Sequence, residues 1–196
     1  MKYFKISATL GAIALVCALL IALINLVTNP VIETNDKTTE LNTCKEIFDK
    51  YDESKSESKS GNDLSNKNEA IIKIIYAKDS DGKSLGTIYK VSGKNAYGTI
   101  TLMVGIDSQN RVCQVEFIEN GQSFASTVNN HVLENYPSSE STDVHLGAYE
   151  KSNGEKISSL ETSKIDGIDV KCGATYGATL VKDLVKIAQN DAKEAN

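Results

Sequence analysis

The chain begins with a long apolar run. From Ile6 to Val27 only Ser7, Thr9 and Asn25 are polar. A helix of these 22 residues, rising about 1.5 Å per residue, is long enough to cross a hydrocarbon core of about 30 Å. A secretory signal peptide has a shorter apolar core of about 7–15 residues, and no small-residue cleavage site closes this run. The pattern predicts an uncleaved transmembrane helix over residues 6–28.

Charged residues flank this run unequally. Lys2 and Lys5 precede it, whereas Glu33 and Asp36 follow it. Because basic flanking residues favour the cytoplasmic side of a membrane, the N-terminus is predicted to be cytoplasmic. The rest of the chain would then lie on the extracytoplasmic face of the cell membrane.

The segment after the run changes character twice. Asn29-Pro30 is expected to interrupt the helix, because proline restricts the residue before it. A second helical pattern then leads to Tyr51. From Asp52 to Asn68 the chain is dominated by Ser, Lys, Glu, Asp and Asn, and such a stretch buries too little apolar surface to offset the entropy of ordering it. This stretch is predicted to be a flexible insertion.

Strand signals gather in the middle of the chain. Ala70–Ala77 is rich in isoleucine, Leu85–Val91 alternates loosely, and Tyr97–Ile106 is apolar and β-branched. Asp107–Asn110 has the composition of a hairpin turn, and apolar and polar residues alternate beyond it over 113–117. These runs predict an antiparallel meander.

Helical spacing returns after the meander. Apolar residues recur every fourth position from Phe124 to Val132, which is typical of a helix that covers one face of a sheet. A polar, Ser-rich connection follows over 137–163, and Ile165–Lys171 is interpreted as a last short strand. From Ala178 to Gln189 apolar residues oppose Lys, Asp and Gln, which predicts an amphipathic closing helix.

The pattern as a whole predicts one domain behind one membrane anchor. Strands and helices segregate along the chain instead of alternating, so the fold class is α+β. In chain order we expect a cytoplasmic N-terminus (1–5), a transmembrane helix (6–28), a juxtamembrane helix (29–51), a flexible polar insertion (52–69), the α+β domain (70–191) and a tail (192–196).

Composition narrows the possible partners and sites. Beyond residue 28 the chain carries 19 basic and 26 acidic residues, a net charge of −7; such a surface repels phosphate backbones, so nucleic acid is not an expected partner. Cys17 lies in the apolar run, which leaves Cys44, Cys113 and Cys172 without a metal-binding spacing. Free thiols are the favoured interpretation, and one disulfide of unassigned pairing stays open. No metal site is predicted.

Candidate chemistry lies between the last expected strand and the closing helix, in the segment from Asp169 to Gly177. Gly173 and Ala174 let a bulky group approach the backbone, and the free N–H groups at a helix start favour a phosphate. The hydroxyl of Thr175 is well placed beside such a phosphate. From the chemistry of these residues alone, a simple N-capping turn is the preferred interpretation.

The same segment resembles the flavinylation motif of the FMN-binding domain family: Asp, two variable residues, Ser or Thr, Gly, Ala, and the modified Thr. That family includes the G subunit of the Rnf ion-translocating ferredoxin:NAD oxidoreductase and the C subunit of the sodium-pumping quinone reductase. The resemblance implies that a flavin transferase joins the FMN phosphate to the Thr175 hydroxyl, with Asp169 as the motif acid. Cys172 replaces the usual Ser or Thr, and Gly177 replaces another common Ser or Thr. A second Gly-Ala-Thr ends at Thr179 without the motif acid and is a minor alternative.

The resemblance extends to other parts of the chain. Thr28–Glu33 resembles the start of Rnf G subunits, and the stretch from Tyr97 to Asp107 resembles the family's Gly-Tyr-Gly-Gly strand with its Val-Gly-Ile-Asp ending. Residues 112–119 are similar to the next strand, whereas 120–127 replace the family's acidic-Thr-Pro-Gly-Leu-Gly loop. The cofactor-binding residues that the resemblance implies are Thr175 as the covalent site, with Asp169, Cys172, Gly173, Ala174, Tyr176, Tyr97, Gly98, Thr99, Ile100 and Ser123 around the flavin.

The resemblance implies a membrane-anchored electron-transfer flavoprotein, with residues 70–191 as an FMN-binding domain. It would be the G subunit of an Rnf-type ion-translocating complex, whose other subunits and flavin transferase would be its partners. Two alternatives stay open: a stand-alone flavinylated carrier for extracellular electron transfer, and a flavin-free anchored binding domain. We expect no enzymatic activity of the isolated chain, because the flavin carries the redox chemistry.

Overall fold

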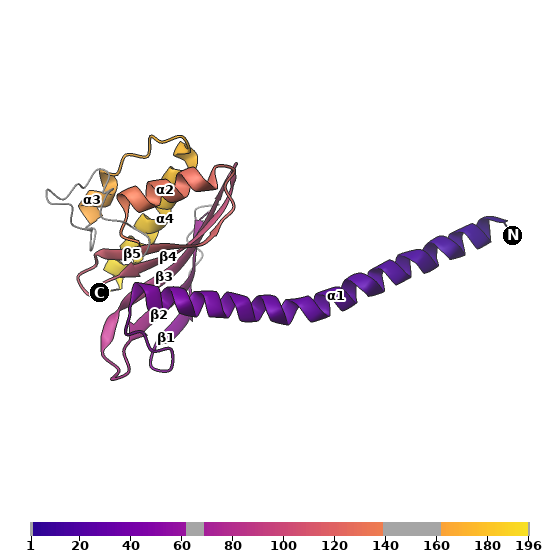
Figure 1. The fold of residues 1–196 in the computed structure, drawn as a ribbon, viewed down its shortest axis with the longest axis horizontal. Helices are drawn as coiled ribbons and strands as arrows, with labels where there is room; N and C mark the ends of the chain where they lie inside the picture. The colour runs from indigo at the N-terminus through magenta and orange to yellow at the C-terminus, as the bar shows by residue number, and fades with distance from the viewer. Residues whose placement is uncertain (1, 62–68, 139–161, 196) are drawn as a thin grey trace. The chain divides into compact units, whose positions relative to one another are not determined.

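The computed structural model describes residues 2–61, 69–138 and 162–195, and Figure 1 shows their path. The chain divides into two compact units, Met1–Glu40 and Leu41–Asn196, and each is described by itself. Helix α1 (Lys2–Ile47) provides the first unit, and its last turns belong to the second.

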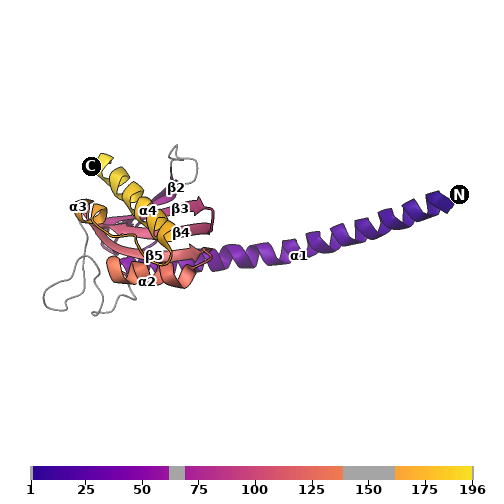
Figure 2. The ribbon, with the colours of Figure 1, turned by 90° about the horizontal axis from the view of Figure 1, so that it is seen from above.

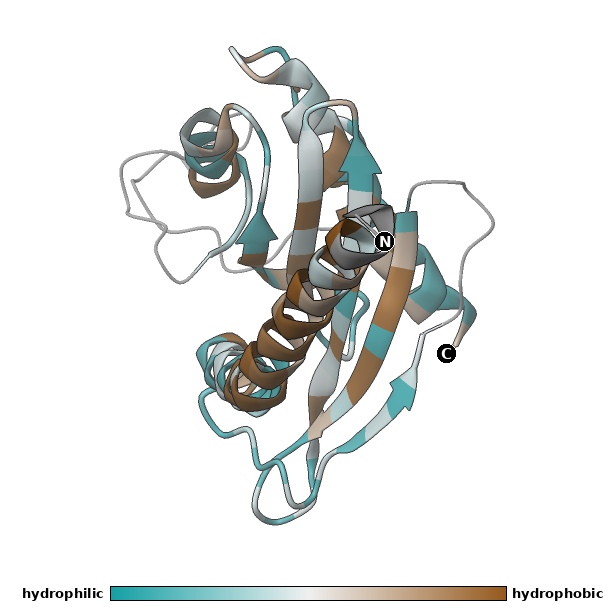
Figure 3. Cartoon of the chain, turned by 90° about the vertical axis from the view of Figure 1, so that its right-hand side faces the viewer, coloured by the Kyte–Doolittle hydropathy of each residue, from teal (hydrophilic) through white to brown (hydrophobic). Residues whose placement is uncertain are grey.

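The first unit is a single apolar helix. Its large apolar side chains, from Ile6 to Ile32, are all at least half exposed, and Figure 3 shows the apolar colour concentrated along α1. A helix that is apolar all round and lacks a protein cover is suited to lipid. In the described part of the chain, one helix is long and apolar enough to cross a membrane, and this helix is α1.

The expected interruption at Asn29-Pro30 is wrong, because α1 continues through Pro30. An interior proline removes one backbone hydrogen bond and crowds the preceding turn, which can kink a helix without ending it. Side chains on either side of Pro30 make contacts along the helix. The Thr34 hydroxyl donates to the Pro30 carbonyl at 2.8 Å, and the Asn29 side-chain amide donates to the Glu33 carboxylate at 3.3 Å.

The second unit contains a five-stranded antiparallel meander in the order β1-β2-β3-β4-β5. Its helices are α2, α3 and α4, and Figures 1 and 2 show α2 and α4 on one face of the sheet. The α+β class and the meander are therefore confirmed. The bounds are β1 (Glu57–Ser60), β2 (Glu69–Lys78), β3 (Ser84–Asn95), β4 (Gly98–Ile106), β5 (Val112–Asn120), α2 (Ala125–Asn135), α3 (Thr162–Asp166) and α4 (Thr175–Glu194).

The sheet buries both of its faces. On β3, Tyr89 and Val91 point into the larger core, which α2 and α4 complete, whereas Ile88 points into a second cluster. That second cluster contains Cys44 and Ile47 from the end of α1. Side chains on the two faces of β2, β3, β4 and β5 thus serve two separate cores. None of the four cysteines, all of which lie in the described part of the chain, forms a disulfide.

Two local predictions need correction. Four residues of the predicted flexible insertion form β1, an exposed edge strand paired with β2; backbone pairing and the Glu57–Lys78 ion pair at 2.7 Å order it, without apolar burial. The strand expected over Ile165–Lys171 is absent, and α3 ends just inside its start. Residues 62–68 of the insertion, and most of the 137–163 connection, lie outside the described residues.

The closing helix is longer than the pattern indicated. Helix α4 begins at Thr175 and ends at Glu194, so most of the predicted tail at 192–196 is helical. Ala192 is buried in the larger core. The helix therefore places Thr175 at its N-terminus and packs along most of its length against the sheet.

Candidate functional site

The motif segment forms a compact turn that leads into α4. The Asp169 carboxylate accepts a hydrogen bond from the Lys171 N–H at 2.9 Å, and the Cys172 N–H donates to the Val170 carbonyl at 2.9 Å. An Asx-type contact of this kind fixes a turn locally. Asp169 thus shapes the backbone ahead of Thr175.

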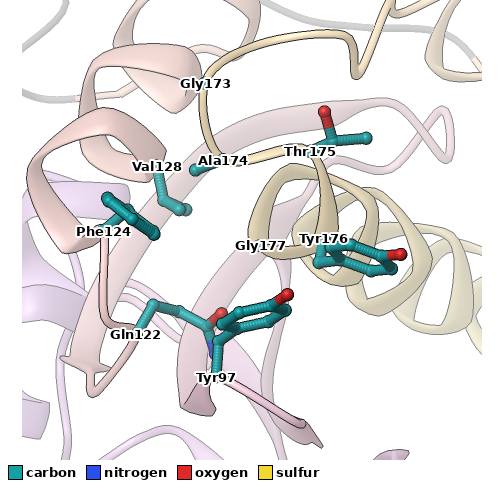
Figure 4. A pocket seen from close by; sticks show the side chains of 9 residues that line it. All are labelled: Tyr97, Gln122, Phe124, Val128, Gly173, Ala174, Thr175, Tyr176 and Gly177. Carbon is teal, nitrogen blue, oxygen red and sulfur yellow. The ribbon is translucent and has the colours of Figure 1, made fainter.

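Thr175 is exposed and is the first residue of α4. Its hydroxyl donates to the Cys172 carbonyl at 2.9 Å, and in Figure 4 the oxygen projects away from the pocket that the neighbouring residues line. The N-cap residue is Ala174, which makes no side-chain capping bond. The interpretation of Thr175 as an ordinary N-cap is therefore wrong.

Thr179 differs from Thr175 in its surroundings. Its hydroxyl donates to the Thr175 carbonyl at 2.8 Å, one turn back along α4, and the residue is half-buried. This side chain is already engaged by the helix backbone and does not line the pocket. Of the two threonines, Thr175 is the more accessible.

A pocket of about 250 Å³ lies beside Thr175. This volume is slightly below the range of about 300–1,000 Å³ that is usual for ligand sites, so the pocket can enclose only part of a large cofactor. Figure 4 shows its lining, which comes from the β3–β4 turn, the loop after β5, α2 and the start of α4. The lining residues are Tyr97, Gln122, Phe124, Val128, Gly173, Ala174, Thr175, Tyr176 and Gly177.

Exposed aromatic side chains form much of the pocket rim. Tyr97, Phe124 and Tyr176 are 43%, 57% and 67% exposed, and among the described residues after α1 only Ile72 is a further exposed large apolar residue. The Tyr97 and Tyr176 rings lie 5.4 Å apart between centroids, at 31°. Such a concentration of exposed aromatic surface is typical of a binding site. Planar aromatic ligands suit it.

Asn95 fixes the two tyrosines to one another. Its side-chain amide donates to the Tyr176 carbonyl at 3.1 Å, and its side-chain oxygen accepts from the Tyr97 N–H at 2.8 Å. One side chain on β3 therefore ties the β3–β4 turn to the start of α4.

The loop after β5 is joined to the start of β4 by three consecutive contacts. The Gly121 N–H donates to the Thr99 carbonyl at 2.8 Å, and the Ser123 N–H donates to the Tyr97 carbonyl at 3.0 Å. Between them, the Gln122 side-chain amide donates to the Gly98 carbonyl at 2.7 Å. These contacts hold the floor and one side of the pocket.

The structure brings together only part of the predicted site. Tyr97, Gly173, Ala174, Thr175 and Tyr176 line the pocket. The predicted residues that do not line it are Asp169, Cys172, Gly98, Thr99, Ile100 and Ser123.

The predicted residues outside the pocket have other roles in the fold. Ile100 is fully buried in the larger core. Ser123 contacts the Tyr97 carbonyl through its backbone and through its hydroxyl, at 3.4 Å. Gly98 has φ +142°, and a Cβ atom there would meet the Gly121 carbonyl. Gly98 is therefore required by the close approach of the loop backbone.

Sequence reasoning missed four lining residues: Gln122, Phe124, Val128 and Gly177. The apolar spacing of Phe124 and Val128 had placed them on a sheet-covering helix face, but Phe124 directly precedes α2 and is exposed. Gln122 carries no sequence signal. In the sequence, Gly177 stands out only as a departure from the flavinylation pattern.

None of the lining residues carries a formal charge. The N–H groups in the first turn of α4 have no intrahelical acceptor and form the positive end of the helix dipole. An uncharged aromatic pocket beside a helix N-terminus with an exposed hydroxyl suits a ligand that combines a flat ring with an anionic group.

Comparison with known proteins bears on the N-terminal part of the chain. A family model described as the RnfG N-terminal region matches residues 3–47. No curated protein matches the chain. The matched segment coincides with α1 and supports an RnfG-like protein, and its apolar helix indicates single-pass membrane anchoring. The match ends before β1. It therefore covers the anchor and none of the residues that line the pocket.

Proposed function

We propose that this chain is an electron-transfer protein that carries one FMN covalently on Thr175, as the G-subunit-like component of an Rnf-type ion-translocating complex. The observation that carries the proposal is an exposed threonine hydroxyl at the first residue of α4, beside an aromatic-rimmed pocket. The RnfG-like N-terminal region favours a membrane complex over a stand-alone carrier.

The surroundings of Thr175 suit a phosphoester. Its hydroxyl oxygen would bond to the phosphorus of FMN with the net loss of water, and its hydrogen bond to the Cys172 carbonyl would be given up. The negative charge of the phosphate would be stabilised by the N-terminus of α4, a contribution of about 0.3–1 kcal/mol at an exposed site. The half-buried Cys172 side chain and the small Gly173 leave the approach to the hydroxyl open.

The pocket would position the flavin ring, because the covalent bond fixes only the phosphate end. The ring supplies the redox chemistry when it is bound. The aromatic side chains of Tyr97, Phe124 and Tyr176 would contact its faces and displace water from them.

Attachment can be tested on the full-length chain, co-expressed with a flavin transferase. We expect a fluorescent flavin band after denaturing electrophoresis and an intact mass increased by one FMN minus water. Thr175→Ala should abolish both signals, whereas Thr179→Ala should retain them. Fluorescence that survives in Thr175→Ala and disappears in Thr179→Ala would move the site to Thr179. No flavin on the wild-type chain would remove the proposed function.

We also propose that the second unit lies on the extracytoplasmic face, with Lys2 and Lys5 in the cytoplasm. Protease added to intact protoplasts should then digest the chain beyond residue 40, while a cytoplasmic marker protein stays intact. Digestion that occurs only after lysis would reverse the orientation. Release of the second unit into the medium without protease would show that the apolar run is a cleaved signal sequence.

A further inference from the structure

The buried floor of the pocket contains one polar side chain. Four lining residues are buried, namely Gln122, Val128, Ala174 and Gly177. Of these, Gln122 alone carries a side chain that can form hydrogen bonds, and it is 7% exposed. The exposed lining residues form a rim around this floor. A flat ring that enters the pocket therefore meets an amide at its inner edge.

The orientation of the Gln122 amide is determined by its contact with Gly98. The Gly98 carbonyl lies 2.7 Å from Nε2, and a carbonyl can only accept, so this end of the amide must be the NH₂ group. The other end, Oε1, is an acceptor. It lies beside the start of α4, since a Cβ atom on Gly177 would be 3.4 Å from it.

Oε1 has no hydrogen-bond partner among the residues that the structure describes. A ligand that fills the pocket would remove the remaining water from this oxygen. Leaving a desolvated acceptor unpaired is unfavourable, so a ligand edge with an N–H donor is preferred there over an apolar edge.

We propose that Gln122 is a specificity-determining residue, whose Oε1 accepts a hydrogen bond from an N–H group on the inner edge of a planar heterocyclic ligand. This inference rests on the proposed function and deepens it. For an isoalloxazine ring, the matching donor is the N3–H of the pyrimidine edge. The dimethylbenzene edge has no donor and would face the rim.

A purely structural role for Gln122 predicts something different. In that role the Nε2 contact with Gly98 would only help to join the loop after β5 to β4. It would need no ligand at Oε1. Under that alternative, N3–H would exchange with water as rapidly as in free FMN. The state of the N3–H proton therefore separates the two roles.

The experiment uses the full-length chain in detergent, flavinylated with ¹⁵N-labelled FMN. In the wild type we expect a resolved N3–H resonance, with exchange slowed by roughly 5-fold or more relative to free FMN, as one neutral hydrogen bond implies. Gln122→Met, which keeps similar volume and lacks the acceptor, should lose this protection. The matched control is Gln114→Met, because Gln114 lies on β5, contacts Glu116 and does not line the pocket. Its spectrum should equal that of the wild type.

The outcomes are distinguishable. A flavinylated wild type whose N3–H exchanges like free FMN overturns the inference and leaves the proposed function standing. Protection that persists in a folded Gln122→Met protein also overturns it. If Gln122→Met does not fold, the wild type is compared after loading with FMN and with its N3-methyl analogue. The methylated ring cannot donate from N3, so it should be more accessible to a soluble fluorescence quencher. Equal quenching of the FMN form and the N3-methyl form of the wild type overturns the inference. Absence of attached flavin removes the proposed function itself.

Discussion

Val128 of α2 occupies the space that a side chain at position 177 of α4 would need. A Cβ atom on Gly177 would lie 2.5 Å from Val128 Cγ2, closer than such atoms approach in proteins. Glycine therefore stands here because α2 and α4 pack closely, at a position where the flavinylation pattern often has Ser or Thr. The glycine at position 177 is thus explained by its packing against α2. It does not require any change at Thr175.

This contact predicts a coupled pair of substitutions. Gly177→Ser should destabilise the second unit by about 1–3 kcal/mol, because overpacking forces side chains or backbone to move. Val128→Ala in the same chain should recover part of that loss, so the double variant is more stable than the sum of the single effects predicts. Denaturant unfolding of the unflavinylated chain measures this. Additive effects would show that the two positions do not compete for space.

Gly98 provides a second prediction, and it differs from what the sequence indicated. The resemblance implies that Gly98 lies beside the flavin, where a larger residue would crowd the ring. In the structure, its φ of +142° and the nearby Gly121 carbonyl make any side chain unfavourable. Gly98→Val should therefore lower the free energy of unfolding of the second unit by about 1–3 kcal/mol.

The matched control for Gly98 is Gly173→Ala. A Cβ atom on Gly173 would lie 3.6 Å from Thr127 Cγ2, an ordinary contact distance, so this variant should melt within a few degrees of the wild type when unflavinylated. Thermal melts of both variants and of the wild type measure the difference. A Gly98→Val protein that melts like the wild type would show that the loop backbone does not exclude a side chain at position 98.

Much of the fold follows from local patterns, and the exceptions have physical causes. The anchor presents one long, uninterrupted apolar run, whereas the meander from β2 to β5 and helix α4 present periodic runs that burial reinforces. Strand β1 is exposed at every position and is ordered by its pairing with β2. It therefore has no apolar pattern from which the sequence could predict it. Ile165 at the end of α3 and Ile168 just after it are both buried. Two buried residues in a segment as short as 165–171 do not distinguish a helix end from an irregular strand.

The candidate site was less predictable than the fold. Thr175, Tyr97 and Tyr176 could be chosen from the motif and its resemblance, and all three meet at the pocket. Gln122 and Val128 enter the pocket through contacts with Gly98 and Gly177, which are far away in the sequence. Contacts between residues so far apart cannot be predicted from the composition or periodicity of a single sequence.

Lys182 is predicted to position the motif segment. Its ammonium group donates to the carbonyls of Asp166 at 2.8 Å and Ile168 at 3.0 Å, immediately before Asp169. Lys182→Met keeps the aliphatic stem and removes both contacts, so it should cost about 1–3 kcal/mol and slow flavinylation of Thr175. Denaturant unfolding and a time course of flavin incorporation measure the two effects.

Lys186→Met is the control for Lys182. Lys186 contacts the Asp166 carboxylate at 2.6 Å at an exposed position, and such surface pairs contribute about 0–1 kcal/mol. We expect little change in stability and none in the rate of flavin incorporation. If both lysine variants slow incorporation equally, the carbonyl contacts of Lys182 have no special role.

The last prediction concerns His131 on α2. The residue is buried, and its Nδ1 lies 3.3 Å from the Asn135 side-chain NH₂, which identifies Nδ1 as an acceptor. Nε2 then carries the proton and has no partner among the described residues. Burial lowers the pKa of His131, opposed by Glu134 and Asp169 and assisted by Lys182.

This lowered pKa makes the second unit sensitive to acid. An unfolded chain binds a proton at His131 near pH 6.5, whereas the folded state binds it only at lower pH. Below about pH 6.5 the unfolded state therefore holds more protons, and stability falls by up to about 1.4 kcal/mol per pH unit until the folded pKa is reached. His131→Phe keeps an aromatic ring and removes the titration, so its stability should fall less between pH 7 and pH 5.

Other groups titrate in the same unit but cancel in this comparison. Burial raises the pKa values of Glu69 and Asp183, with Asp183 also raising that of Glu69; folded carboxyls of this kind favour stability at low pH, opposite in sign to His131. Both proteins share them, so the difference between the two stability curves reports His131 alone. Denaturant unfolding at several pH values measures the curves. Parallel curves for wild type and His131→Phe would show that His131 titrates equally in the folded and unfolded states.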